Sequence, residues 1–168
     1  GEIPSEDTSS LLTLADIEKA EQRKEVDHDF KMIKKFIVWD VADGGADLHT
    51  IKAYENTTEI QSIELRDKTV EQAEPYVWRL LRQVGGNCIV WDNDGIGRVA
   101  GRLLEAARDA GTTLLPFEGS SRDVNEPSTF YNKRDEAHWD MRRYFTEGMI
   151  KINYNGELHE ELATLKID

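Results

Sequence analysis

The sequence has 168 residues, a formal net charge of −12 and a single cysteine, Cys88. One cysteine excludes an internal disulfide and a thiolate metal cluster, and it fits a reducing cytoplasm. The acidic charge argues against a broad nucleic-acid-binding surface, because such surfaces are usually basic, but it allows a local basic groove and carboxylates that bind divalent cations. No apolar run approaches the ~20 residues needed to cross a membrane, so we expect no membrane partner.

The first 30 residues differ in character from the rest of the chain. They are acidic and carry Pro4 with clusters of Ser and Thr. Thr13 and Asp16 mark a helix start, and Leu14, Ile17 and Ala20 would share one face of that helix. We therefore predict a linker over residues 1–30 that carries one short helix and packs loosely. Residues 31–168 then form one domain with a sizeable core.

Apolar periodicity and turn signals define the remaining elements. We predict strands over residues 35–41, 48–54, 59–65, 88–91, 112–117 and 150–153. We predict helices over residues 70–84, 96–107, 132–147 and 158–165. The strands at 35–41, 88–91 and 112–117 are expected to be buried. A hairpin that leads into a parallel βαβ pattern indicates an α/β fold with a mixed sheet and helices on both faces, which is the ribonuclease-H-like topology.

The tetrapeptide Ile-Val-Trp-Asp occurs twice, ending at Asp40 and at Asp92. If the two strands are parallel neighbours, both carboxylates lie at the carboxyl edge of the sheet, where ligands of open α/β sheets bind. Adjacent carboxylates repel each other, and a divalent cation relieves this repulsion. Oxygen ligands favour Mg²⁺ or Mn²⁺, and two such ions can cleave phosphodiesters. The alternative is that each Asp only caps a turn.

Further acids follow these two strands. Asp47 is a third candidate ligand, and Asp43 and Asp94 are weaker ones because Asp beside Gly commonly forms turns. Gly95 and Gly97 could let the backbone approach a phosphate at a helix start, although tight turns need glycine in any case.

Basic residues gather around the helix expected at 132–147. Lys133, Arg134 and Arg142, together with Arg122, could form a strip that contacts DNA phosphates. The competing interpretation is a solvated helix face. His49, His138 and His159 show no spacing typical of a metal site, and the tryptophans of the repeated tetrapeptide are expected in the core.

Three segments, in this order, resemble the nuclease domain of the large terminase subunit of tailed bacteriophages: residues 40–47, 92–97 and 131–136. Residues 1–4 resemble the linker to the packaging ATPase, and residues 158–162 resemble a segment late in the nuclease domain. The resemblance implies a ribonuclease-H-like fold that cuts concatemeric double-stranded DNA with two Mg²⁺ or Mn²⁺ ions in the host cytoplasm. It also implies as partners the ATPase domain of the same polypeptide, the portal protein and the small terminase subunit.

Matched residue by residue, Asp40 resembles the first catalytic acid of the family and Asp92 the second. Asp47 resembles an additional acid, with a spacing one residue longer. The third catalytic Asp of the family lies in a Ser-Pro-Asp-like segment beyond the last short helix, and that segment is absent here, as is a Walker-type phosphate loop. We therefore expect a nuclease-domain fragment truncated at its C-terminus that lacks one metal ligand.

Two other functions compete with this interpretation. In the first, the chain is a non-catalytic assembly module that docks to the packaging ATPase or the portal. In the second, it is another ribonuclease-H-like enzyme, such as a junction resolvase or a transposase. The paired acids at the strand ends favour a nuclease, whereas the missing third acid and the net charge of −12 favour the assembly module.

Overall fold

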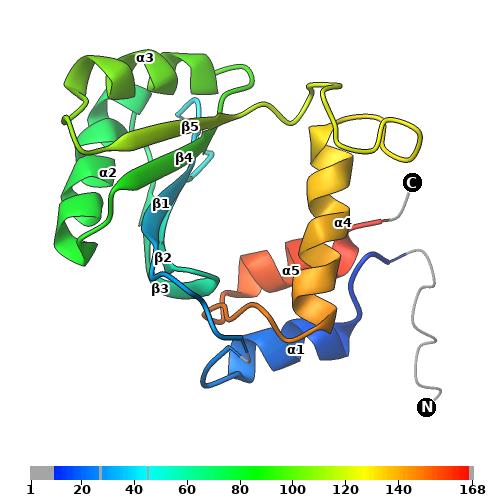
Figure 1. Ribbon diagram of the computed structural model, residues 1–168. Coiled ribbons are helices and arrows are strands. Elements are labelled where there is room, and N and C mark those ends of the chain that lie inside the picture. Colours follow the sequence, from blue (N-terminus) through cyan, green and yellow to red (C-terminus); the bar gives the residue numbers. More distant parts are fainter. Residues whose placement is uncertain (1–9, 27, 45, 167–168) are drawn as a thin grey trace.

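The computed structural model describes residues 10–26, 28–44 and 46–166, and a five-stranded sheet with the order β3-β2-β1-β4-β5 lies at its centre (Figure 1). The strands are β1 (Lys35–Asp40), β2 (His49–Glu55), β3 (Thr58–Leu65), β4 (Cys88–Asp92) and β5 (Thr113–Phe117). The first three strands form an antiparallel meander, and β4 and β5 continue the sheet in parallel with β1. This confirms the predicted mixed sheet of the ribonuclease-H-like topology.

Two helices, α2 (Val70–Val84) and α3 (Gly97–Ala107), cover one face of this sheet. Alternation along β1 directs Ile37 and Trp39 toward them, and both side chains are fully buried in the main core. We call β1–β5, α2 and α3 the sheet lobe.

Helix α2 shows how local sequence sets the limits of an element in this lobe. A capping box joins Thr69 and Gln72 at its start, where the backbone N–H groups would otherwise lack acceptors. At its end the chain turns at Gly85, whose φ of 71° suits glycine.

The other three helices, α1 (Leu14–Gln22), α4 (Lys133–Thr146) and α5 (Gly156–Thr164), lie together beyond the opposite face of the sheet, and we call them the helical lobe (Figure 1). A second, smaller core holds them together. Its buried members are Leu12, Ile17, Ala20, Phe145, Ile152 and Leu162. Segments from both ends of the sequence therefore build this lobe jointly.

The described part of the N-terminal segment is packed more tightly than predicted. Helix α1 begins at the expected capping box of Thr13, but Ile17 and Ala20 are 0% exposed. Leu14, expected on the same buried face, is 50% exposed. Loose packing was the wrong expectation because a few well-spaced apolar residues suffice when helices from distant sequence cover them. The linker role of residues 1–30 and the boundary at residue 31 remain proposals, and residues 1–9 lie outside the described part.

Two strands differ from expectation. β5 is not buried: it pairs only with β4 at the edge of the sheet, and Leu115 is 49% exposed. Residues 150–153 form no strand, since Lys151 makes a single bridge to Thr58 before the chain turns away. Edge position and the direction of the chain after a bridge depend on the tertiary arrangement, which apolar patterning does not report. In the part of the chain described, no helix has both the length and the apolar composition to span a bilayer.

Candidate metal centre

The two acids of the repeated tetrapeptide end adjacent strands on one face of the sheet. β1 and β4 are parallel, and Trp39 is in register with Trp91. Both tryptophans are buried on the face that α2 and α3 cover, so the alternation of side chains turns Asp40 and Asp92 to the opposite face. Both aspartates keep part of their surface open to solvent there. Asp92 also accepts a hydrogen bond of 3.0 Å from the backbone N–H of Asp94, so the alternative role of capping a turn applies to it as well.

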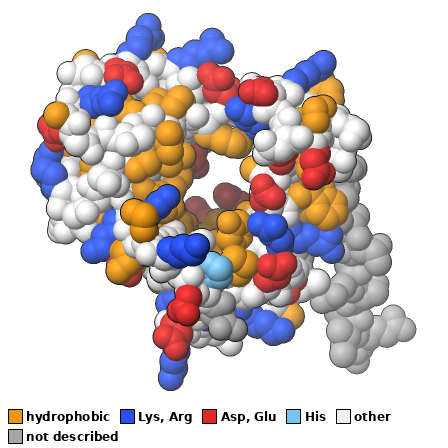
Figure 2. Space-filling model, in the orientation of Figure 1, with side chains coloured by type: hydrophobic (Ala, Val, Ile, Leu, Met, Phe, Trp, Pro, Cys, Tyr) orange, Lys and Arg blue, Asp and Glu red, His pale blue; other side chains and the backbone are white. Residues whose placement is uncertain are grey.

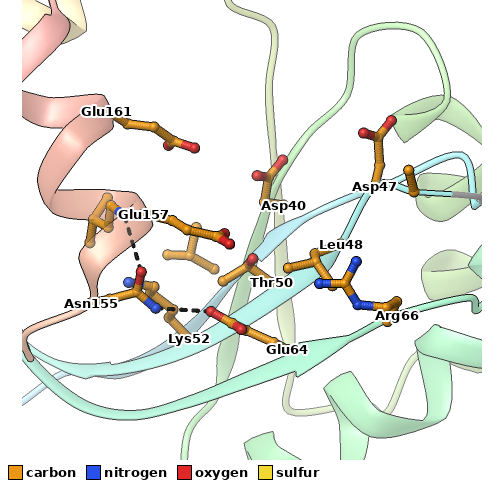
Figure 3. A pocket seen from close by; sticks show the side chains of 13 residues that line it. Asp40, Asp47, Leu48, Thr50, Lys52, Glu64, Arg66, Asn155, Glu157 and Glu161 are labelled. Atoms are coloured by element: carbon orange, nitrogen blue, oxygen red, sulfur yellow. Dashed lines mark hydrogen bonds between the residues drawn. The ribbon is translucent and has the colours of Figure 1, made fainter.

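A cleft of about 530 Å³ lies between this face of the sheet and helix α5 (Figure 3). Asp40 stands near the centre of the view, with Asp47 on one side and α5 on the other. The carboxylates that line the cleft are Asp40, Asp47, Glu64, Glu157 and Glu161. In the space-filling view an opening separates the two lobes, with acidic side chains at its inner rim (Figure 2). The cleft is therefore built from both lobes and is strongly acidic.

The electrostatics of Asp40 reflect this crowding. Loss of hydration at the cleft floor raises the pKa of its carboxyl above the ordinary value, and the negative charges of Asp92, Glu161 and Asp47 raise the pKa further. Ionised Asp40 is thus destabilised by its neighbours, which is the condition that a bound cation relieves.

The acids are not close enough together to form a complete metal-coordination site. Among the described residues, no group of three or more His, Cys, Asp or Glu side chains is arranged closely enough to hold a metal ion. Mutual repulsion of the carboxylates across an open cleft accounts for this spread.

Helix α5 is fastened to the sheet at its start. Asn155 caps the helix by accepting from the N–H of Leu158 at 3.0 Å, and its amide donates to Glu64 on β3 at 2.9 Å (dashed in Figure 3). Just upstream, the backbone N–H of Asn153 donates to buried Glu59 at 2.7 Å. These bonds hold the first turn of α5 over the cleft, so Glu157 and Glu161 face the sheet.

Sequence reasoning missed Glu64 on β3 and two further cleft acids, Glu157 and Glu161 on α5. Glu157 and Glu161 are four residues apart and therefore share one face of α5, beside the half-buried Leu158. This spacing was readable, but a pair of glutamates on a surface helix is common. Only the position of α5 over the sheet gives it meaning.

The acid and the glycines in the turn after β4 stabilise the turn itself. Asp94 accepts hydrogen bonds of 3.0 Å and 2.9 Å from the backbone N–H and the hydroxyl of Ser120, and it lies 3.6 Å from Arg134. These contacts lower the pKa of Asp94, chiefly through the backbone bond from Ser120. A Cβ at Gly97 would lie 1.7 Å from the carbonyl oxygen of Asp92, so glycine is needed for the tight turn itself. Asp43 is exposed and does not line the cleft.

The four basic residues predicted to contact DNA do not line the acidic cleft. Arg134 is engaged with Asp94, and the Arg122 guanidinium donates to the hydroxyl of Tyr131. Arg142 stacks over Trp139 with its Cζ 5.0 Å from the ring centroid, and Lys133 is half-buried. The basic side chains that do line the cleft are Lys52 and Arg66, of which Lys52 lies 2.7 Å from Glu59.

Comparison with known proteins finds similarity in structure alone. No family model and no curated protein matches the sequence. Among solved structures, the chain is similar to the nuclease domain of the large terminase subunit gp2 of bacterial virus Sf6, with 17% identity, a TM-score of 0.71 and coverage of 92% of this chain and 79% of that one. It is also similar to the large terminase nuclease of thermophilic phage G20c with bound magnesium, with 14% identity, a TM-score of 0.68 and coverage of 95% and 82%.

A third similar structure is a K428A mutant of the Sf6 domain with manganese and beta-thujaplicinol, at 17% identity and a TM-score of 0.63. The second and third of these structures carry divalent metals, and the likeness extends over nearly the whole chain. At such low identity it is a likeness of fold. The resemblance seen in the sequence is confirmed at that level: the chain adopts the ribonuclease-H-like fold of the large terminase nuclease domains.

Proposed function

We propose that this chain is the divalent-metal-dependent endonuclease domain of a viral DNA-packaging terminase, and that it cuts concatemeric double-stranded DNA in the host cytoplasm. The observation that carries the proposal is the pair Asp40 and Asp92, which end adjacent parallel strands on the same face of the sheet. Asp40 lines the acidic cleft, and the negative charge of Asp92 raises the pKa of Asp40. The fold shared with terminase nuclease domains supports it.

The donor set of the cleft suits two Mg²⁺ or Mn²⁺ ions. Asp40, Asp92 and Asp47 would hold them, and Glu161 on α5 would serve where the family uses a later Asp. All of these donors are carboxylate oxygens, which these hard cations prefer. When bound, such ions activate the attacking water and stabilise the departing oxygen of a phosphodiester. The carboxylates would reach them by side-chain rotation, because the cleft is open and Asp40 already experiences the charges of the other three.

Cationic side chains would position the DNA. Arg66 lines the cleft beside the acids and would contact a phosphate next to the cut, while Lys133, Arg134, Arg142 and Arg122 would contact phosphates further away. The net charge of −12 repels a duplex, so the isolated chain should bind DNA weakly. Because binding would come from these cationic contacts with phosphates, the affinity should fall steeply as salt is raised. The packaging ATPase domain, the portal protein and the small terminase subunit would present the duplex to the cleft.

Supercoiled plasmid incubated with the chain and Mn²⁺ tests this function. We expect nicking followed by linearisation with little sequence preference, and we expect Mg²⁺ to support less cleavage because it demands more regular coordination. EDTA and the Asp40→Asn variant should each abolish cleavage. Cleavage that persists in EDTA or in that variant would contradict the assignment.

A second function is the non-catalytic assembly module. It is favoured because the acids of the described residues are not close enough together to coordinate a metal ion. In that case the chain would dock to the packaging ATPase or the portal without cutting DNA. Complete absence of cleavage under Mn²⁺, with native folding confirmed by circular dichroism, together with binding to the ATPase domain, would favour this alternative.

A further inference from the structure

His49, at the start of β2, is a fully buried histidine whose two ring nitrogens are both engaged. Nδ1 lies 3.2 Å from the indole Nε1 of Trp39 and 3.1 Å from the backbone nitrogen of Ala42. Nε2 lies 2.9 Å from the carbonyl oxygen of Lys68. The three partners come from β1, from the turn after it and from the residues just before α2.

The chemistry of these partners assigns the tautomer. An indole N–H and a backbone N–H are both donors, so Nδ1 must accept from them and cannot carry a proton. A carbonyl oxygen only accepts, so Nε2 carries the proton and donates to Lys68. His49 is therefore neutral, with its proton on Nε2.

The two groups that bind Nδ1 lie on either side of Asp40. Trp39 is the residue before it, and Ala42 lies two positions after it, where the chain leaves the strand for the acidic turn. A single acceptor thus fixes both the side chain that precedes Asp40 and the backbone that follows it. The bond from Nε2 to Lys68 links the imidazole ring to the segment just before α2 and so fixes the orientation of the ring.

We propose that His49 is a positioning residue that holds the Asp40 turn in the conformation required for metal binding. This inference rests on the proposed function, since it concerns the same carboxylate. Asp40 sits among like charges that push it away from its neighbours. The turn that carries it must therefore be held by something other than the acids, and the Nδ1 acceptor supplies that restraint.

Two substitutions separate the two ring nitrogens. In His49→Asn, the side-chain carbonyl oxygen stands at the position of Nδ1, so the acceptor for Trp39 and Ala42 is retained and the bond to Lys68 is lost. In His49→Gln, the amide nitrogen reaches the position of Nε2, so the bond to Lys68 is retained and the acceptor is lost. The two variants are alike in polarity and each removes part of the same buried network.

Mn²⁺ binding to the 168-residue chain, measured by calorimetry without DNA, is the first readout. We expect His49→Gln to weaken binding about tenfold, the scale seen when an outer-shell partner of a metal site is lost, and His49→Asn to weaken it clearly less. Leu104→Ala, which empties a fully buried position on α3, is the control for general destabilisation and should leave Mn²⁺ affinity unchanged well below its melting temperature. Equal weakening in both His49 variants, or none in His49→Gln, would overturn the proposal.

Amide hydrogen exchange supplies a readout that needs no metal. The Ala42 amide should exchange faster in His49→Gln than in His49→Asn or in Leu104→Ala, because only the first loses its acceptor. Unchanged Ala42 exchange in His49→Gln would overturn the positioning role by itself. If Asp40→Asn binds Mn²⁺ as well as the wild-type chain, the proposed function fails, and the exchange result still decides whether His49 holds the turn.

Discussion

The sheet lobe and the helical lobe are stabilised in different ways. The sheet lobe has one continuous core. The alternating strands contribute residues such as Ile37 and Trp39 to it, and the two amphipathic helices contribute residues such as Leu80 and Leu104. The helical lobe has a small core assembled from residues near both ends of the chain, and polar contacts supplement it. His159 on α5 lies 2.9 Å from Glu21 on α1, and the guanidinium of Arg23 donates to the carbonyl of Ile150 at 2.6 Å.

This difference matters because the candidate metal centre draws on both lobes. Asp40, Asp92 and Asp47 belong to the sheet lobe, whereas Glu157 and Glu161 belong to the helical lobe. The sheet lobe thus provides the aspartates of the candidate site, and the helical lobe provides the glutamates on the opposite side of the cleft. Substitutions in the two lobes should have separable effects on catalysis, stability and metal affinity.

The largest effect should come from the sheet lobe. Asp92→Asn keeps the shape of the side chain and removes its charge, and a lost ligand should cost more than the roughly 10- to 100-fold that loss of an outer-shell partner costs. Plasmid cleavage rates in Mn²⁺ measure this effect. Asp43→Asn is the matched control, because Asp43 is exposed near the same sheet edge and, unlike Asp92, is not among the charges that act most strongly on Asp40. Equal loss in both variants would argue for a general charge effect.

The next effect concerns the stability of the helical lobe. Ile17 is 0% exposed, so Ile17→Ala should lower the free energy of unfolding by about 2–5 kcal/mol. Leu14 lies on the same helix and is 50% exposed, so Leu14→Ala should change the free energy of unfolding by less than ~0.5 kcal/mol. Urea denaturation followed by circular dichroism compares the two. If Ile17→Ala were as stable as the wild-type chain, α1 would be no more than a loosely attached linker.

A smaller effect tests the contribution of α5 to the centre. Glu161→Gln should weaken Mn²⁺ binding by roughly tenfold or less, since Glu161 is one of several carboxylates around the cleft. Glu160→Gln removes the same charge from the neighbouring position, which does not line the cleft, and should leave the affinity almost unchanged. Calorimetric titration of both variants decides whether the helical lobe supplies a ligand or only covers the site.

The smallest effect is a pH-dependent gain in stability. The pKa of Asp40 is raised in the folded state, so ionising it costs stability as pH rises from below the unfolded value of about 3.9 through the folded value. In EDTA, Asp40→Asn should therefore melt at a higher temperature than the wild-type chain at pH 7 and at the same temperature near pH 3. A lower melting temperature of the variant at pH 7 would show that the ionised carboxylate is stabilised without metal.

The sheet lobe was predictable because its signals are local and agree with one another. The repeated Ile-Val-Trp-Asp strands, the capping box at Thr69 and the glycine turn at Gly85 each point to the element found. The helical lobe was only partly predictable: α1, α4 and α5 were expected, but their joint core depends on contacts between residues as distant as Leu12 and Leu162. No periodicity within one segment reports such a contact.

The residues of the candidate site likewise fall into those that the sequence predicted and those that it did not. Asp40 and Asp92 follow from strand pattern and register, which sequence carries directly. Glu161 and His49 were missed because their importance comes from what lies opposite them in space. A surface glutamate and a lone histidine look ordinary until α5 is placed over the sheet and the turn after β1 is folded back onto β2.

Diffraction from crystals soaked in Mn²⁺, recorded where manganese scatters anomalously, tests the central claim most directly. We predict anomalous peaks within ligand distance of the Asp40 and Asp92 carboxylates, with Glu161 turned toward them, and the loss of those peaks in Asp40→Asn. Manganese bound only at other surface carboxylates, with Asp40 and Asp92 left in contact with solvent, would contradict it.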